Sequence, residues 1–449
     1  MKRQTTMKIY DNLFEFAHSG AIRFFMPGHK GGASLGSNYL SSVMPYDVTE
    51  LNATDDLFDP KHVIAESQRA LSDRFGVMAA HYLTGGSTLG LYGALSLSAR
   101  PGDRVIFDRG CHKSVIDAAV LLGLRPVFLG AEYSAEGILL PPSSADVYAA
   151  LEKYPDASSV VITSPSYYGL CASLEMIHAI TDAAGAELIV DAAHGGNMLF
   201  MDRLPLCAEF TVVSLHKTLP ALTGAAVLFS NKYPAEEITK RLSLFSTSSP
   251  SYLILASAEK CITYMDSEGR ESLYALAEKA AYFTAWLDIS TPFSHIEQAS
   301  SDITRIVIHT GRTLMSGYEL YDSLEDEFAI ICEMADDENV VLIPSVANSA
   351  SDFEALQAAL LSLSARARKK FSYAPPDPPP DPVFGMDMRE AFFSDKEYIS
   401  PRAANGRISC ETLTKYPPGI PYLMPGQLIG PYEAALMERL GVRKVSVVK

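Results

Sequence analysis

The sequence predicts an α/β protein with three parts: a large domain with a mainly parallel sheet, a smaller α/β domain and a carboxyl-terminal segment. Short apolar runs alternate with helical patterns over residues 104–229, which is the rhythm of βαβ units in a parallel sheet covered by helices. A second, shorter alternation of strand-like and helical stretches covers residues 300–363. The connector APPDPPPDP follows at 374–382, and we expect it to be stiff because proline fixes the backbone.

We expect five parts along the chain. They are an amino-terminal arm (1–45), a large domain (46–250), a helical bridge (251–290), a small α/β domain (291–373), and the connector with a carboxyl-terminal domain (374–449). The arm contains the Gly-rich sequence FFMPGHKGGASLG and little periodicity, so we expect it to be extended. From Val63 the spacing predicts a helix that stops at Gly76.

Composition limits the classes of function. The 449 residues are 48% hydrophobic and 20% charged, as in globular proteins. No run approaches the roughly 20 apolar residues that span a membrane, and the start of the chain lacks the apolar core of a signal peptide. We therefore expect a cytoplasmic protein without a membrane partner. A formal net charge of -16 disfavours nucleic acid as a partner and is compatible with a cationic substrate. The six cysteines show no C-x-x-C spacing, so we expect no metal site and no disulfide framework.

A lysine follows the apolar run at residues 210–213, in the sequence FTVVSLHK. The run is β-branched and aromatic enough for a buried strand, and open α/β sheets bind ligands beyond the carboxyl ends of their strands. Lys217 would therefore lie at a site, where a lysine amine can bind the aldehyde of a cofactor covalently. When this short sequence is considered alone, a surface lysine after a strand is the alternative explanation.

Two further features strengthen the first explanation. The preceding apolar run, residues 186–191, ends in Asp191. Pyridoxal phosphate needs a lysine for its aldehyde and an acid for its ring nitrogen. The sequence LTGGSTLGL places Gly86, Ser87 and Thr88 at the start of a helical pattern, and helix amino ends bind phosphate through free N–H groups. An ordinary helix cap would also explain this last feature.

Three His-Lys pairs occur, at 29–30, 112–113 and 216–217, so the choice of the reactive lysine needs an argument. Only Lys217 follows a strand that comes just after the acid-bearing one. Lys30 lies in the arm, and Lys113 opens a helix after a short loop. The ring of His112 would either stack on the flat cofactor ring or contact backbone or water at the start of that helix.

Eight segments stand in an order that is typical of one enzyme family: FFMPGHKGG, DVTELNATDDLFDP, LTGGSTLGL, DRGCHKSV, ITSPSYYG, DAAHGGN, SLHKTLPALTG and YPPGIPYLMPG. In them the sequence resembles the ornithine/lysine/arginine decarboxylase family of fold type I pyridoxal phosphate enzymes, in its short form without an amino-terminal wing domain. The resemblance covers most of the chain. It implies a PLP-dependent transferase-like (fold type I) large domain and a homodimer, or a higher homo-oligomer, with shared active sites.

The resemblance also implies roles for single residues. Lys217 would bind pyridoxal 5'-phosphate covalently, Asp191 would pair with the ring nitrogen, and His112 would stack on the ring. His194, beside Asp191, would contact the cofactor or the substrate. The residues expected at the phosphate group are Gly86, Ser87, Thr88, Ser214 and His216. The implied reaction is the decarboxylation of arginine, lysine or ornithine to a polyamine or a polyamine precursor.

At four positions the sequence replaces a polar or charged residue that is usual in the family. The family usually reads D-E-A-H-G-A-H where this chain has DAAHGGN, so Ala192 and Asn197 replace a glutamate and a histidine. Gly224 stands where glutamine is usual, and Gln427 where glutamate is usual. These departures affect the identity of the substrate more than the cofactor. Two alternatives therefore stay open: another fold type I enzyme, such as an aminotransferase or a lyase, and a catalytically silent binding protein.

A basic substrate would need carboxylate partners, and residues 46–60 are acidic, although they would also suit a solvated loop. The candidates, from this chain or from a neighbouring subunit, are Asp47, Glu50, Asp55 and Asp56. If Gln427 lines the pocket, its missing charge favours arginine, whose planar fork can use neutral acceptors. We rank arginine first, then lysine, then ornithine. The α-carbon would receive its proton from His194, Lys217 or a cysteine.

Overall fold

The computed structural model describes residues 7–20, 23, 26–27, 30, 40, 42–296, 301–368, 379–415 and 419–449. The chain divides into two compact units. The first combines Met1–Leu97 with Ala192–Leu273, and the second combines Ser98–Asp191 with Tyr274–Lys449. This division does not test the five parts expected from the sequence, which remain a prediction.

The first unit contains three strands of the large sheet. β7 (Ala226–Ser230) lies between β1 (Ala79–Leu83) and β6 (Phe210–Ser214) and runs antiparallel to both. Every residue of the three strands is buried. The helices of this unit are α1 (Ile9–His18), η2 (Met44–Tyr46), α2 (Val63–Phe75), α3 (Gly86–Ser98), α7 (Gly196–Phe200), α8 (Ala235–Leu242), α9 (Tyr252–Met265) and the first turn of α10 (Glu268–Ser290).

The second unit carries the βαβ rhythm of the sequence. Its four strands of the large sheet are parallel, in the order β5-β4-β2-β3. The predicted mainly parallel sheet is therefore confirmed, with β7 as the reversed strand. The elements are β2 (Arg104–Phe107), α4 (Lys113–Leu122), β3 (Arg125–Phe128), α5 (Ser144–Lys153), β4 (Ala157–Thr163), α6 (Leu174–Ala184) and β5 (Glu187–Asp191).

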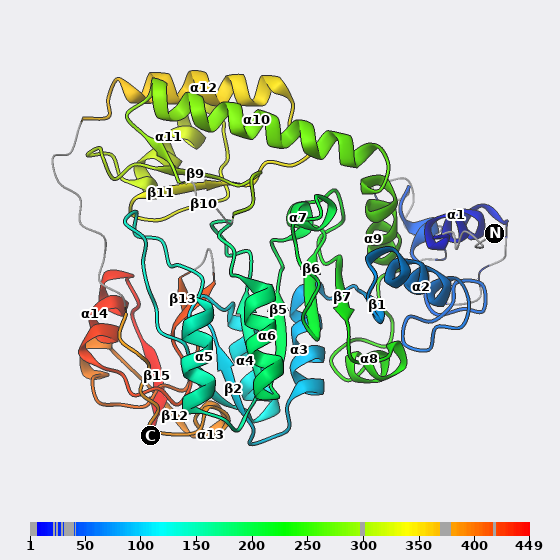
Figure 1. Ribbon diagram of the computed structural model, residues 1–449, viewed down its shortest axis with the longest axis horizontal. Coiled ribbons are helices and arrows are strands. Elements are labelled where there is room, and N and C mark those ends of the chain that lie inside the picture. Colours follow the sequence, from blue (N-terminus) through cyan, green and yellow to red (C-terminus); the bar gives the residue numbers. More distant parts are fainter. Residues whose placement is uncertain are drawn as a thin grey trace. The chain divides into compact units, whose positions relative to one another are not determined.

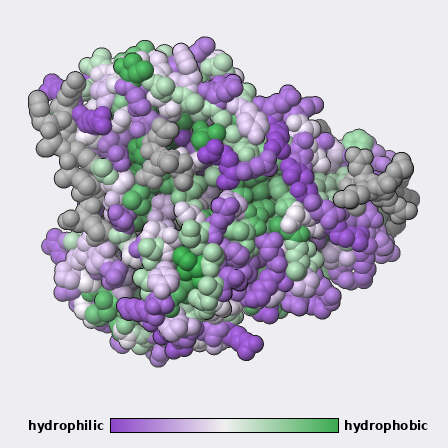
Figure 2. All heavy atoms as spheres, viewed as in Figure 1, coloured by the Kyte–Doolittle hydropathy of each residue, from purple (hydrophilic) through white to green (hydrophobic). Residues whose placement is uncertain are grey.

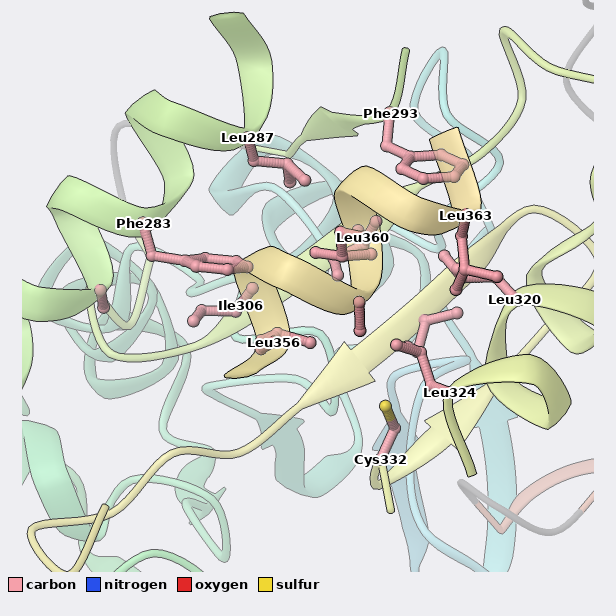
Figure 3. Close-up of a cluster of buried hydrophobic side chains, with 14 residues drawn as sticks. Phe283, Leu287, Phe293, Ile306, Leu320, Leu324, Cys332, Leu356, Leu360 and Leu363 are labelled. Carbon is pink, nitrogen blue, oxygen red and sulfur yellow. The ribbon is translucent and has the colours of Figure 1, made fainter. Parts of the chain in front are cut away.

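The second unit also contains the smaller sheet that the sequence predicted after residue 300. Four strands pair antiparallel in the order β10-β11-β9-β8. Helices α10 and α12 lie along each other beside this sheet (Figure 1), and their apolar side chains form one buried cluster with α11, in which Phe283, Ile306 and Leu360 take part (Figure 3). The elements are β8 (Ser294–His295), β9 (Ile306–His309), α11 (Gly317–Phe328), β10 (Met334–Ala335), β11 (Asn339–Leu342) and α12 (Ala350–Ser364).

The carboxyl-terminal segment is folded, as its apolar composition predicted, over residues 379–415 and 419–449. It has its own buried cluster, which includes Leu423, Met437 and Val447. Its elements are α13 (Met388–Phe393), β12 (Lys396–Ile399), η3 (Pro401–Ala403), β13 (Leu413–Lys415), β14 (Ile420–Leu423), α14 (Pro431–Arg439) and β15 (Val445–Val448). Residues 374–378 of the expected Pro-rich connector lie outside the described residues.

The amino-terminal arm differs from the prediction of an extended segment, because α1 forms within it. Ile9 and Leu13, four residues apart, lie on one face of α1 and are buried. The Tyr10 N–H donates to the buried Glu259 carboxylate on α9 at 2.9 Å. Packing of this apolar face against α9 therefore stabilises a helix too short to be stable alone. Most of the FFMPGHKGGASLG sequence, His29 included, lies outside the described residues.

Hydrophilic residues predominate on the face of the molecule in Figure 2, and hydrophobic residues gather there in separate patches. Within the part of the chain that the structure describes, no helix combines the length and the apolar character that a membrane crossing requires.

Asp55 in the acidic stretch stabilises the start of α2. It has a φ of 65° and is 6% exposed. Its carboxylate accepts hydrogen bonds at 2.9–3.0 Å from the N–H groups of Lys61, His62 and Ile64. Burial alone would raise the pKa of Asp55, but these N–H donors bring it below the usual value. Asp55 is therefore a capping residue, and its carboxylate is not available to a substrate cation.

We predict that Asp55→Ala lowers the free energy of unfolding by about 2 kcal/mol at neutral pH, the upper part of the range for helix caps. Asp59→Ala is the matched control, because the Asp59 carboxylate is 66% exposed and pairs only at the surface with Lys61. This control should lower the free energy of unfolding by less than about 0.5 kcal/mol. Because the pKa of Asp55 is lower in the folded protein, its contribution is present above pH 3.8 and is lost as the pH falls through the folded value. Urea unfolding at several pH values measures this. Equal losses in the two variants would contradict the capping role.

Candidate active site

Lys217 lies in the turn that follows β6, as the sequence predicted. The strand ends at Ser214, and the next residues turn away from the sheet. The Lys217 amine lies 3.1 Å from Nε2 of His194, which is 6% exposed. A neutral imidazole accepts at Nε2 when its proton is on Nδ1, so this contact lets a lysine ammonium donate to His194. The structure therefore brings together two of the three predicted catalytic residues.

The segment after β5 approaches the lysine turn closely, and glycine makes this possible. A Cβ atom on Gly196 would lie 2.5 Å from Oγ1 of Thr218 and 3.0 Å from the Leu219 side chain. No side chain fits at that distance, so α7 can start against the lysine turn only at a glycine. Thr218 is itself 2% exposed. The contact fixes the backbone that follows His194 against the backbone that follows Lys217.

The predicted phosphate-binding residues lie at the amino end of α3. Gly86, Ser87 and Thr88 form its first turn and are half-buried. The Gly86 N–H donates to the carbonyl of Gly224 at 2.8 Å, which ties this turn to the segment after Lys217. The following N–H groups are the ones that a helix leaves without partners inside itself, and they suit an anion.

Gly224 is one of the four departures from the family, and the backbone explains it. Its φ is +96°, a conformation that favours glycine, and a Cβ atom there would lie 3.1 Å from the carbonyl oxygen of Thr84. A glutamine at this position would therefore strain the backbone and push against the turn that leads into α3.

Ser214 and His216 border the same turn. The Ser214 hydroxyl is fully buried and has no hydrogen-bond partner in the part of the chain that the structure describes. A buried hydroxyl without a partner is costly, and a phosphate oxygen would satisfy it. Nδ1 of His216 donates to the carbonyl of Ala225 at 3.1 Å. Its Nε2 can therefore donate to a phosphate only when the ring is an imidazolium.

In the second unit, Asp191 ends β5 and is 2% exposed. Asp108 follows β2 with the same exposure, and it accepts a hydrogen bond from the N–H of Thr163, the residue that pairs with Asp191 in the sheet. Burial raises the pKa of Asp108 to about 7, and the charge of Asp191 adds to the effect. Two buried carboxyl groups therefore flank β4. Sequence reasoning missed Asp108, although RVIFD ends in an acid just as AELIVD does.

His112 caps α4. Its Nδ1 accepts from the N–H of Ser114 at 3.2 Å, and its ring is half-buried. The sequence analysis gave this backbone contact as the alternative to stacking on the cofactor ring. The contact fixes one edge of the His112 ring. Stacking of the ring remains a prediction. Lys113 opens α4 as expected and forms an ion pair with Asp117 one turn later. That pair makes Lys113 a poor candidate for the reactive lysine.

Gln427 does not support the expectation that it lines a substrate pocket. It is 2% exposed, its Oε1 accepts from the N–H of Met424, and its Nε2 donates to Glu433 at 3.1 Å. The amide is thus used inside the carboxyl-terminal domain, and a glutamate here would meet the Glu433 carboxylate. Ala192 and Asn197 are also fully buried, so these departures from the family lie in the interior of the chain.

Known proteins resemble this chain over most of its length. The family description "Orn/Lys/Arg decarboxylase, major domain" matches residues 8–310, and "Orn/Lys/Arg decarboxylase, C-terminal domain" matches residues 386–444. An arginine decarboxylase of Bacillus subtilis is 28% identical over 94% of this chain and 91% of its own length. The uncharacterized protein YaaO of the same organism is 30% identical over 98% of this chain and 95% of its own length. Among solved structures, a lysine decarboxylase of Francisella novicida is similar with a TM-score of 0.86 at 16% identity, over 99% of this chain and 81% of that one, which shows the fold.

We predict that Gly224→Ala both destabilises the protein and weakens cofactor binding. Gly102→Ala is the matched control, since Gly102 has a φ of +89° and no atom within 4 Å of an added Cβ. The control should lower the free energy of unfolding by about 1 to 2 kcal/mol, which is the cost of placing alanine in the left-handed backbone conformation. Gly224→Ala should cost more and should weaken the binding of pyridoxal phosphate, because the added methyl displaces the turn at Thr84. Thermal unfolding and cofactor titration measure the two effects. Equal stability losses with unchanged cofactor affinity would refute the proposed coupling.

Proposed function

The chain belongs to the Orn/Lys/Arg decarboxylase family, and from that premise we propose that it decarboxylates a basic amino acid with the help of pyridoxal phosphate. The product would be a polyamine or a polyamine precursor. The observation that carries the proposal is the Lys217 amine beside His194, at the end of a buried strand within the segment that the major-domain description matches. Relatives with the names arginine decarboxylase and lysine decarboxylase support it, and they give no support to an aminotransferase or a silent protein.

The residues present fit this cofactor. The unsatisfied Ser214 hydroxyl and the open amino end of α3 suit its phosphate, and Lys217 suits its aldehyde. We assign Asp191 to the ring nitrogen and the ring of His112 to stacking. When bound, the cofactor supplies an electron-accepting ring that takes up the electron pair left after the loss of carbon dioxide.

His194 and Lys217 would handle the proton that the α-carbon receives. Their nitrogen atoms are 3.1 Å apart, so one proton can reside on either Nε2 or Nζ. The His194 ring is buried, and Lys217 is half-buried. We propose that this pair, rather than Cys111, delivers the proton, because burial raises the pKa of the Cys111 thiol and makes it a weaker acid.

Among the four acidic candidates for the distal end of the substrate, we propose Glu50 as the main partner of its positive charge. Asp55 caps α2, whereas Oε1 of Glu50 is buried without a hydrogen-bond partner among the described residues. A guanidinium or an ammonium would compensate this oxygen. Asp47 and Asp56 remain further candidates. A homodimer with shared sites and a cytoplasmic location remain proposals from the sequence and its resemblance.

The test is a screen of the purified protein for carbon dioxide and amine products over arginine, lysine and ornithine. We predict release of both products, with kcat/KM highest for arginine, then lysine, then ornithine. Glu50→Gln should lower kcat/KM for the preferred substrate by about tenfold or more, the value of a charge-assisted hydrogen bond. Glu66→Gln, which changes an exposed acid in the first turn of α2, is the control. Preference for a neutral or acidic amino acid, or no carbon dioxide from any of the three, would overturn the proposal.

A further inference from the structure

A cavity of about 400 Å³ lies within the second unit. Its walls come from three places: the hairpin that Tyr133 and Leu139 close, the turn at residues 336–339, and β14 with α14. The hairpin and the turn are joined by a hydrogen bond from the Asn339 amide to the carbonyl of Glu136. The size is within the range of pockets for small molecules. None of the residues predicted for the cofactor lines this cavity.

Arg109 is the unusual residue of the wall. It is 9% exposed, and its guanidinium lies over the ring of Phe128 at 5.7 Å from the centroid. Within the part of the chain that the structure describes, it has no hydrogen-bond or ion-pair partner. None of its nitrogen atoms is among the buried polar atoms that lack a partner, so its donors are open to the cavity. They can bind an acceptor on a molecule that enters it.

Other donors line the cavity. Arg439 on α14 lines the cavity, and both guanidinium groups act on the Tyr432 hydroxyl electrostatically. Tyr133 also lines the cavity within reach of the Arg109 charge. Two positive charges and two phenol hydroxyls thus face one region, and guanidinium groups bind carboxylates through paired hydrogen bonds.

Acidic residues also line the cavity. Asp336 is not available to a ligand, because its carboxylate accepts from the Tyr168 hydroxyl at 2.6 Å and from Asn339. Glu136, the exposed Asp337 and Glu338 are the other acidic lining residues. A ligand with several negative charges would be repelled by them, whereas an ammonium or guanidinium would be attracted. Apolar lining side chains, Leu139 and Leu436 among them, suit a short aliphatic stem.

We propose that this cavity binds a free α-amino acid as a zwitterion, with its carboxylate on Arg109 and its positive end toward Glu136 and Asp337. A basic amino acid fits best, because it carries a second positive charge. The inference rests on the proposed function only for the choice of arginine as the probe and agmatine as its analogue without a carboxylate.

Calorimetric titration tests the proposal in the Lys217→Ala protein loaded with pyridoxal phosphate, in which arginine is not turned over. We expect two equivalents of arginine per chain: one that changes the absorption of the cofactor and one that does not. Arg109→Gln should weaken the second at least tenfold and keep the first. Arg402→Gln, at an exposed arginine paired with Glu438, is the control and should keep both. Agmatine should not occupy the second site.

The proposal is overturned if the second equivalent is missing from the parent protein, if Arg109→Gln retains it, or if agmatine or inorganic phosphate binds there as tightly as arginine. If Arg109→Gln fails to fold, Tyr432→Phe replaces it, since this side chain is 40% exposed and only its hydroxyl is lost; weaker binding of the second equivalent supports the proposal, and unchanged binding overturns it. Absence of the equivalent that changes the cofactor absorption, with the second one retained, would count against the proposed function and support this inference.

Discussion

The hydrogen bond from Gly86 to Gly224 is the constraint on which the first unit's chemistry depends. It joins the start of α3, where a phosphate would bind, to the segment that follows Lys217. Gly224 can accept it only in a backbone conformation that favours glycine, next to the carbonyl of Thr84. The close approach of Gly196 to Thr218 fixes the other side of the lysine turn. The lysine that would bind the proposed cofactor covalently and the start of α3 that would bind its phosphate therefore cannot move independently of each other.

Electrostatics in the second unit complement this rigidity. Burial raises the pKa of Asp108 to about 7, and the Asp191 charge contributes. At neutral pH a substantial fraction of Asp108 is therefore protonated, and the two carboxyl groups together carry less than two negative charges. An uncharged Asp108 lowers the repulsion between these two buried carboxyl groups.

The sequence predicted most of what depends on local pattern, and it failed where distant parts of the chain decide. The strands before Asp191 and Lys217, the helix that stops at Gly76 and the mainly parallel sheet all follow from periodicity and turn chemistry. The helix α1 was missed because its stability comes from α9, about 250 residues away. Gln427 looked like a pocket residue, but its partner Glu433 became visible only once the carboxyl-terminal domain was folded. The sequence could not show that Arg109 lacks a hydrogen-bond partner either, because this depends on which residues of the folded chain surround it.

We propose above all that Lys217 carries the cofactor. Borohydride reduction of the yellow protein, followed by peptide mass spectrometry, tests it most directly, because the reduction makes the lysine linkage permanent. We expect one pyridoxyl group per chain, on the peptide that contains Lys217. A modified peptide that contains Lys30 or Lys113, or no modified lysine at all, would contradict the account.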